Sequence, residues 1–285
     1  MFKGHSLSIN LPEPCITWES NVLHLAKVEF ISSTGLATNM AKAIIDEARI
    51  QGMKAISLDD IGLKEVPLDL LDLKALLRVN LSHNKITELP DDIPQLKNLE
   101  ILSLYTNRLT SIPKSINQLS SLRRLILSNN SIKELPQGFG TCSSLEYLDL
   151  SCNKLSSLSA NFGYLTTLKT LYLSDNILTT LPNEIGNLAI LEIFVLRDNK
   201  LSSLPKEFGR LKSLVHLNLQ GNQFKTLPTC LLEIPLNKKD TKLLLAGNPF
   251  EPNVKRVLKQ GGVPKLYKEM KEPTWNKEKP EQQSQ

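Results

Sequence analysis

The stretch that decides the fold is Leu165 to Pro182, which reads Leu-Thr-Thr-Leu-Lys-Thr-Leu-Tyr-Leu-Ser-Asp-Asn-Ile-Leu-Thr-Thr-Leu-Pro. Its leucines are arranged around one asparagine, Asn176. The pattern returns every 23 residues, with one last step of 26, and its asparagines are Asn84, Asn107, Asn130, Asn153, Asn176, Asn199, Asn222 and Asn248. One unit before Asn84, Ile61 replaces the asparagine while the apolar positions around it are kept. A constant register over so many copies predicts a stack of similar structural units.

Each unit combines a short strand, an asparagine and a return path. The apolar pair before the asparagine, such as Leu171 and Leu173, alternates with outward residues, as a strand with one buried face requires. The asparagine amide can pair backbone groups that no strand serves, so stacked units predict an asparagine ladder. A Leu-Pro or Ile-Pro step then ends strand pairing and starts the return path. Ser159 stands where neighbouring units have proline, so we expect a local change of path there.

The sequence divides into five parts. We predict a disordered N-terminal extension over 1–38, an N-terminal helical cap over 39–55, repeats over 56–250, a C-terminal helical cap over 251–272 and a disordered tail over 273–285. Ala41, Ile44, Ile45 and Ala48 follow the spacing of an amphipathic helix. Because a solenoid must cover its first and last apolar layers, we expect a helix at each end.

Composition and charge narrow the functional class. The net charge is +5, and residues 253–285 alone carry +4, from eight Lys and Arg against four Glu. The nearly neutral repeat region argues against nucleic acid as the principal partner. No stretch reaches the roughly 18 apolar residues of a membrane span, and the N-terminus lacks the apolar segment of a secretory signal. The four cysteines form no cluster at either end, which favours a reducing, cytoplasmic environment. Cys142 occupies a leucine position, so we expect it in the core.

Motifs for catalysis and metal binding are missing from the sequence. It contains no phosphate-binding glycine loop, no His-Glu-x-x-His and no Cys-x-x-Cys pair, and its histidines are far apart along the chain. We therefore predict no catalytic residues, no cofactor and no metal site, and we expect the protein not to be an enzyme.

The informative positions are those that each strand directs away from the core. They lie six, four, two and one residues before each asparagine and together form a concave surface on the order of 40 Å long, since strands are about 4.8 Å apart. Tyrosine and arginine are favoured as interface anchors. The candidate partner-binding residues on this surface are Arg78, His83, Tyr105, Arg124, Tyr147, Asp149, Tyr172, Asp175, Arg197, Asp198 and His216.

Each of these residues has a plainer interpretation as ordinary strand surface. Tyrosine has good strand propensity, and neighbouring aromatic rings can simply stack on one another. Binding is favoured for the surface as a whole, because no other part of the chain predicts a large preformed concavity.

The repeat unit Leu-x-x-Leu-x-x-Leu-x-Leu-Ser-x-Asn-x-Leu-x-x-Leu-Pro-x-x-Ile-Gly-x resembles that of the intracellular Ras-group leucine-rich repeat proteins, the group that includes the Ras suppressor protein. The similarity is greatest at Tyr164–Asn176, at Leu196-Arg-Asp-Asn and at Leu204-Pro-Lys-Glu-Phe-Gly, and it covers about residues 41 to 270. It implies an α/β fold, a leucine-rich repeat solenoid (horseshoe) with a parallel concave sheet of about nine short strands and helical caps at both ends.

The same resemblance implies a cytoplasmic scaffold or adaptor of small-GTPase (Ras-like) signalling or adhesion complexes. Its partner would be a folded protein, such as a small GTPase or an adaptor linked to one, and the family offers no catalytic residues. The alternative is a substrate-recognition or regulatory subunit of a phosphatase or ubiquitin ligase. That role needs an additional docking module, for which only the N-terminal extension and the basic tail are candidates.

Overall fold

The computed structural model describes residues 34–272 and residue 275, which all belong to one compact unit spanning Ser33–Gln285. The predictions of disorder for the N-terminal extension and the tail fall almost entirely on residues 1–33, 273–274 and 276–285, outside the described residues.

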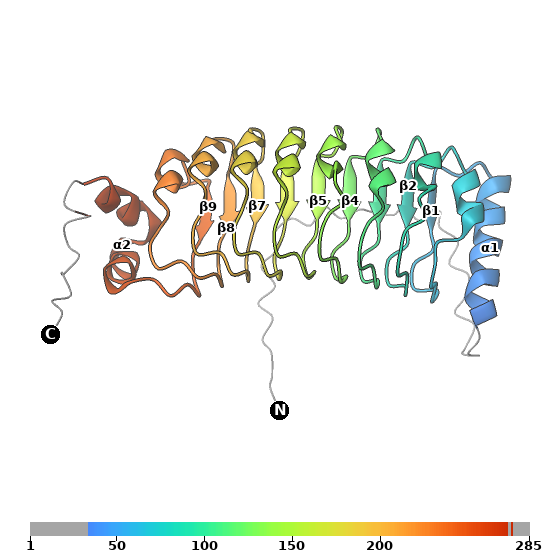
Figure 1. The fold of residues 1–285 in the computed structure, drawn as a ribbon, viewed down its shortest axis with the longest axis horizontal. Helices are drawn as coiled ribbons and strands as arrows, with labels where there is room; N and C mark the ends of the chain where they lie inside the picture. Colours follow the sequence, from blue (N-terminus) through green and yellow to red (C-terminus); the bar gives the residue numbers. More distant parts are fainter. Residues whose placement is uncertain (1–33, 273–274, 276–285) are drawn as a thin grey trace, which may run out of the picture. The chain divides into compact units, whose positions relative to one another are not determined.

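Nine strands of three residues each form one parallel sheet in chain order (Figure 1). They are β1 (Ala55–Ser57), β2 (Arg78–Asn80), β3 (Ile101–Ser103), β4 (Arg124–Ile126), β5 (Tyr147–Asp149), β6 (Thr170–Tyr172), β7 (Ile193–Val195), β8 (His216–Asn218) and β9 (Lys242–Leu244). Equivalent positions of consecutive repeats are paired, so that Leu148 lies beside Leu171, and Leu171 beside Phe194. The sequence period thus determines which residues pair in the sheet, and the predicted nine-stranded parallel solenoid is confirmed.

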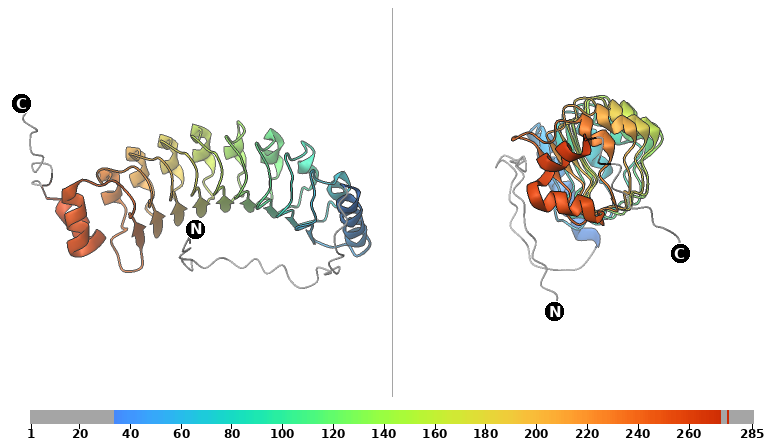
Figure 2. Two further views of the ribbon diagram at one scale, coloured as in Figure 1. Left: turned by 90° about the horizontal axis from the view of Figure 1, so that it is seen from below. Right: turned by 90° about the vertical axis from the view of Figure 1, so that its left-hand side faces the viewer.

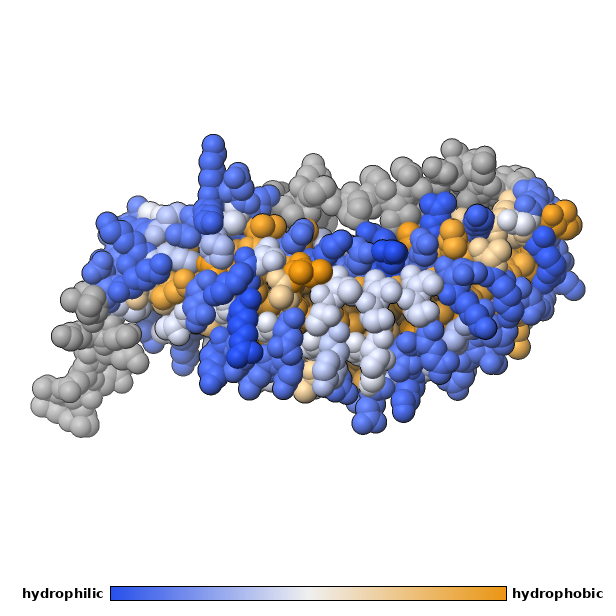
Figure 3. Space-filling view, turned by 90° about the horizontal axis from the view of Figure 1, so that it is seen from above, coloured by the Kyte–Doolittle hydropathy of each residue, from blue (hydrophilic) through white to orange (hydrophobic). Residues whose placement is uncertain are grey.

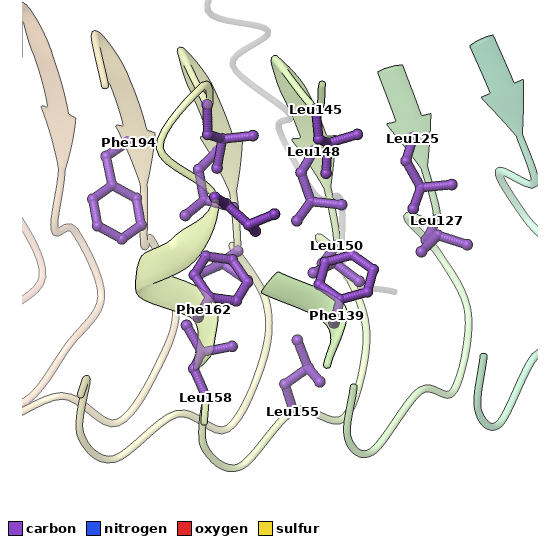
Figure 4. Close-up of a cluster of buried hydrophobic side chains, with 14 of the residues drawn as sticks. Leu125, Leu127, Phe139, Leu145, Leu148, Leu150, Leu155, Leu158, Phe162 and Phe194 are labelled. Atoms are coloured by element: carbon purple, nitrogen blue, oxygen red, sulfur yellow. The ribbon is translucent and has the colours of Figure 1, made fainter. Parts of the chain in front are cut away.

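The core lies between the sheet and the return path. The middle residue of each strand points inward, and on the return path large apolar residues point back toward it, as Leu148, Phe139 and Phe162 do in Figure 4. Cys142 is also buried in this core, as predicted. A single repeat cannot bury its own apolar face, so each depends on its neighbours for stability.

The return path of each repeat contains a short 3₁₀ helix on the side of the repeats opposite the sheet (Figure 2). These helices are η1 (Leu68–Asp72), η2 (Ile93–Gln95), η3 (Lys114–Gln118), η4 (Phe139–Thr141), η5 (Ala160–Tyr164), η6 (Asn183–Asn187), η7 (Lys206–Arg210) and η8 (Thr229–Glu233).

The start of these helices explains the role of the Leu-Pro step. At η6 the carbonyl of Pro182 accepts a hydrogen bond from the Ile185 N–H at 3.1 Å, with φ −68° and ψ 153°. Ser159 has nearly the same conformation, φ −74° and ψ 157°, and accepts from the Phe162 N–H at 3.0 Å. The expected change of path at Ser159 is therefore wrong. The turn needs a carbonyl and a φ near −70°, and serine supplies both.

Glycine on the return path allows neighbouring 3₁₀ helices to pack closely. A Cβ added at Gly140, Gly163 or Gly186 would lie within 2.4 Å of a backbone carbonyl oxygen of the next repeat. For Gly163 that oxygen belongs to Glu184, which precedes Ile185 in η6. These positions require glycine because of close approach, with φ in the ordinary negative range.

The predicted asparagine ladder is confirmed. Asn176 Oδ1 accepts a hydrogen bond from the Leu155 N–H at 2.9 Å, and its Nδ2 donates to the carbonyls of Leu150, Leu173 and Ser174 at 3.0 to 3.2 Å. The ladder asparagines from Asn84 to Asn248 bond in the same way to their own repeat and to the preceding one. The ladder therefore links every repeat to its predecessor.

The first apolar layer is covered by α1 (Thr34–Ile50), in which Ala41, Ile45 and Ala48 are buried. The helix begins five residues before the predicted boundary at 39. It ends before Gly52, whose φ of 60° is typical of a residue that terminates a helix.

The last apolar layer is covered by α2 (Pro252–Met270), which is kinked at Gly262, where φ is 64° and ψ is −156°. Val254, Val257 and Leu266 are buried against the last repeat. The hydroxyl of Tyr267 donates to the Leu231 carbonyl at 2.8 Å, which fixes the second half of α2 to η8.

The last repeat is three residues longer than the others, and its extra length lies between η8 and β9. Asn248 nevertheless accepts from the Phe224 N–H at 3.1 Å and donates to the Leu219 carbonyl at 2.8 Å. The ladder thus continues through the insertion.

Candidate protein-binding surface

Strand register places the candidate residues in four rows on the concave face of the sheet. Arg78, Arg124, Tyr147 and His216 belong to the row of first strand residues, and Asp149 and Tyr172 to the row of third strand residues. Tyr105 and Arg197 lie two residues before their ladder asparagines, and His83, Asp175 and Asp198 lie one residue before theirs. The structure thus distributes the candidates over the sheet from β2 to β8.

At the centre of this face, three candidates from neighbouring strands contact one another. The guanidinium carbon of Arg124 lies 4.1 Å from the ring centroid of Tyr147, a cation–π contact. The rings of Tyr147 and Tyr172 are 5.7 Å apart at an interplanar angle of 49°. Aromatic pairs at this distance attract each other, so the cluster holds its own geometry. All three side chains remain partly exposed.

A second group forms at the N-terminal end of the sheet. His83 Nδ1 lies 2.9 Å from a carboxylate oxygen of Asp59, and its ring meets the ring of Tyr105 edge-on at 5.1 Å. Tyr105 is 40% exposed, which makes it one of the most accessible large side chains of the sheet. Asp59 was not among the predicted residues, because the concave positions were counted back from the asparagines, and the first repeat has Ile61 in place of one.

Carboxylates collect where β5, β6 and β7 end. Burial raises the pKa of the half-buried Asp149, and burial together with the negative charge of Asp198 raises the pKa of Asp175. Arg197 partly offsets this, and its Nε donates to Asp198 at 2.6 Å. The predicted Asp149, Asp175, Arg197 and Asp198 are therefore brought together beside the central tyrosines.

Two candidates stand apart from these groups. His216 is only 5% exposed, and its Nε2 is buried with no hydrogen-bond partner within the described part of the chain. Burial and the nearby Lys242 lower its pKa, so the ring is neutral near pH 7. Arg78 lies on β2, two strands away from Arg124. His216 therefore offers little surface to a partner, whereas Arg78 is partly accessible.

Comparison with known families identifies the repeat. A family model described as "Leucine-rich repeat region" matches residues 49–174, and one described as "Leucine rich repeat" matches residues 166–224. The chain is a leucine-rich repeat protein. Such domains typically serve as protein-binding modules rather than enzymes, because stacked repeats offer an extended concave surface.

Two solved structures are similar to this leucine-rich repeat protein. A leucine-rich repeat protein of Leptospira interrogans has 33% sequence identity and a TM-score of 0.54, over 74% of this chain and 64% of that one. The ectodomain of the Arabidopsis thaliana membrane receptor kinase GASSHO1/SCHENGEN3, in complex with CASPARIAN STRIP INTEGRITY FACTOR 2, has 29% identity and a TM-score of 0.57. That match covers 65% of this chain and 23% of the ectodomain. The chain thus spans less than two thirds of either structure. A search of curated proteins gives no match.

The described residues of this leucine-rich repeat protein bring together no three His, Cys, Asp or Glu side chains that could hold a metal ion. Within residues 34–272, neither helix has the length and apolar character needed to cross a membrane.

The thiols of Cys142 and Cys230 are buried, and burial raises the pKa of each to about 11, which leaves them unreactive near pH 7. The concave face thus presents tyrosines, arginines and carboxylates suited to binding.

One feature of the concave face was missed by the sequence analysis. In every repeat, the residue directly before the ladder position has a positive φ, of 52° to 75°. These residues are Asp60, His83, Thr106, Asn129, Cys152, Asp175, Asp198, Gly221 and Gly247. Asp, Asn and Gly tolerate this conformation best and fill most of the row, which is the signal that could have revealed it. Three of the candidate residues are thus held by a left-handed backbone.

Proposed function

We propose that this protein is a non-catalytic scaffold or adaptor that binds a folded protein on its concave face. The observation that supports this most is the central cluster of Arg124, Tyr147 and Tyr172. Tyrosine and arginine dominate the energetics of interfaces, especially when they cluster near the middle of a contact surface. Here they lie preassembled on a rigid sheet, so binding requires little ordering of these side chains.

The similar plant ectodomain is known in complex with CASPARIAN STRIP INTEGRITY FACTOR 2, which is consistent with a binding role for this chain as well. The resemblance to the Ras-group repeats suggests a more specific setting, with a small GTPase or an adaptor linked to one as the partner and the cytoplasm as the compartment. The alternative of a recognition subunit for a phosphatase or ubiquitin ligase uses the same concave face. It differs in requiring a second attachment site for the enzyme.

The test compares two double variants of equal size. Tyr147→Ala with Tyr172→Ala removes the tyrosine pair, whereas Lys114→Ala with Asn183→Ala changes exposed positions at the start of η3 and η6, on the opposite side. We expect the tyrosine variant to lose the main partner captured from cell extract, since anchor truncation typically costs about 2 kcal/mol or more. The control should retain it. Both variants should keep the circular dichroism spectrum of the wild type.

Loss of the partner by the control and retention by the tyrosine variant would show that the concave face is not the binding surface. The identity of the captured protein, read by mass spectrometry, then separates the GTPase setting from the enzyme-subunit alternative.

A further inference from the structure

The two sides of the tyrosine pair, Tyr147 and Tyr172, carry opposite charge. On one side lie Asp149, Asp175 and Asp198, from the ends of β5, β6 and β7, which we call the acidic corner. On the other lie Arg124 and, two strands further, Arg78, which we call the basic corner. Strand spacing and rise place Arg124 and Asp198 roughly 20 Å apart along a diagonal of the sheet.

The acidic corner contains more negative charge than its surroundings neutralise. Its three carboxylates face one guanidinium, that of Arg197, which bonds to Asp198. The raised pKa of Asp175 has burial as its largest cause and repulsion from Asp198 as its second. An added cation at this corner would therefore be attracted.

The carboxylate of Asp149 is not needed for the fold. Its Oδ1 accepts a hydrogen bond from the Ser151 N–H at 2.9 Å. Asn80 and Asn218 occupy the same position of their strands and accept the equivalent bond, both at 3.0 Å. An amide would thus serve the backbone equally well without placing a charge in a half-buried site. The hydroxyls of Ser128 and Ser151 also hydrogen-bond to this carboxylate, but neither carries a charge, so the charge of Asp149 is available for a cationic ligand.

The positive charge of the basic corner is not neutralised within the described residues. The guanidinium of Arg124 contacts the ring of Tyr147, and neither Arg124 nor Arg78 forms a salt bridge with a described carboxylate. Both side chains are partly exposed, so a carboxylate of a partner can reach their guanidinium groups from the concave side. The basic corner is thus prepared for an anion.

We propose that the partner presents a lysine or arginine to the acidic corner, an aspartate or glutamate to the basic corner, and an apolar contact to the tyrosine pair between them. The occupant is the folded protein of the proposed function, on which this inference rests. Complementary charges at two separated corners define a single docking orientation, because a partner rotated by half a turn would place like charges together.

The probe is the protein that the wild-type chain captures and the tyrosine variant loses. We expect Asp149→Asn with Asp175→Asn to weaken its binding about tenfold or more at low salt, and less at high salt. Asp60→Asn is the control, because it makes one such Asp-to-Asn change on the same face but after β1, away from the tyrosine pair. It should leave the affinity within about twofold, as expected for a change outside the contact.

Carbodiimide cross-linking, which joins amines to carboxylates, determines the orientation. Partner lysines should be joined to Asp175 or Asp198. In an Arg124→Lys variant, which supplies an amine at the basic corner, partner aspartates or glutamates should be joined to that lysine.

Capture that depends on the tyrosine pair, with the same affinity for the double Asn variant as for the wild type, would overturn the inference and leave the proposed function standing. Absence of any partner that depends on the tyrosines would overturn both.

Discussion

Two rows of positions run along the stacked repeats, four residues apart in each repeat, and they are filled in opposite ways. The ladder row is asparagine in eight consecutive repeats, from Asn84 to Asn248. The row of third strand residues contains Ser57, Asn80, Ser103, Ile126, Asp149, Tyr172, Val195, Asn218 and Leu244. The first row serves buried backbone groups that recur in each of these eight repeats, so its residue type does not vary among them. The second faces away from the core, where side chains are free to differ and to bind.

A third row, at the edge where the strands begin, is intermediate in how strictly its residue type is kept from repeat to repeat. Asn98, Ser121, Ser144, Thr167 and Ser213 each donate a hydrogen bond to a carbonyl 24 residues earlier. At the equivalent position of one repeat stands Ile190, which is 43% exposed. In Figure 3 this edge is mostly hydrophilic, with apolar side chains in small groups. Because exposed carbonyls can bond to water instead, this row tolerates an exception in the middle of the repeats, where the ladder row from Asn84 to Asn248 has none.

The largest expected effect comes from breaking the ladder row. Asn176→Leu removes the acceptor of the Leu155 N–H, which has no other acceptor within the described residues. The carbonyl of Leu150 keeps Asn153 as a donor, and that of Leu173 keeps Asn199. We expect a loss of at least roughly 1–3 kcal/mol of unfolding free energy. Urea denaturation measures it, with the surface change Lys169→Ala as control. Equal stability of the two variants would show that the ladder asparagine is not required for the fold, and that the two rows do not differ in the way described.

A smaller effect of opposite sign is expected in the variable row. Asp149→Asn keeps the bond to the Ser151 N–H and removes a charge that the fold disfavours, so the Tm at pH 7 should rise by about 2 °C or less. Burial raises the pKa of Asp149, so the folded state binds its proton more readily than the unfolded chain does. Acidification through the folded pKa therefore stabilises the wild type relative to the variant. The difference in Tm should shrink from pH 7 to pH 4, and a growing difference would contradict the argument.

The smallest effect is expected at the edge row. Ser121→Ala removes one exposed hydrogen bond to the Lys97 carbonyl and should cost less than about 0.5 kcal/mol. Ile190→Thr, which supplies the missing hydroxyl, should change stability by no more than a similar amount. The same denaturation experiment measures both. If Ser121→Ala lost as much unfolding free energy as Asn176→Leu, exposure to solvent would not be what decides which rows keep one residue type.

These rows also show how far the sequence could predict the molecule. The ladder, the strand register and the burial of Cys142 were predicted, because a strict period of 23 residues determines which positions align. Ser159 was misjudged because a missing proline was taken for a missing turn, whereas the turn depends on φ and on a carbonyl. The burial of His216 was not predictable from its row, because its exposure depends on surroundings that the period does not describe. The contact between His83 and Asp59 was missed because the concave positions were counted back from the asparagines, and the first repeat has Ile61 instead of one.

The insertion between η8 and β9 has a consequence for engineering. Three extra residues enter the chain there, yet Asn248 keeps its bonds to Leu219 and Phe224 and the sheet gains its ninth strand in register. Loop length is thermodynamically cheap when the elements on both sides keep their partners. We therefore expect this loop to tolerate the insertion of an epitope, a fluorophore attachment site or a small domain without loss of the fold.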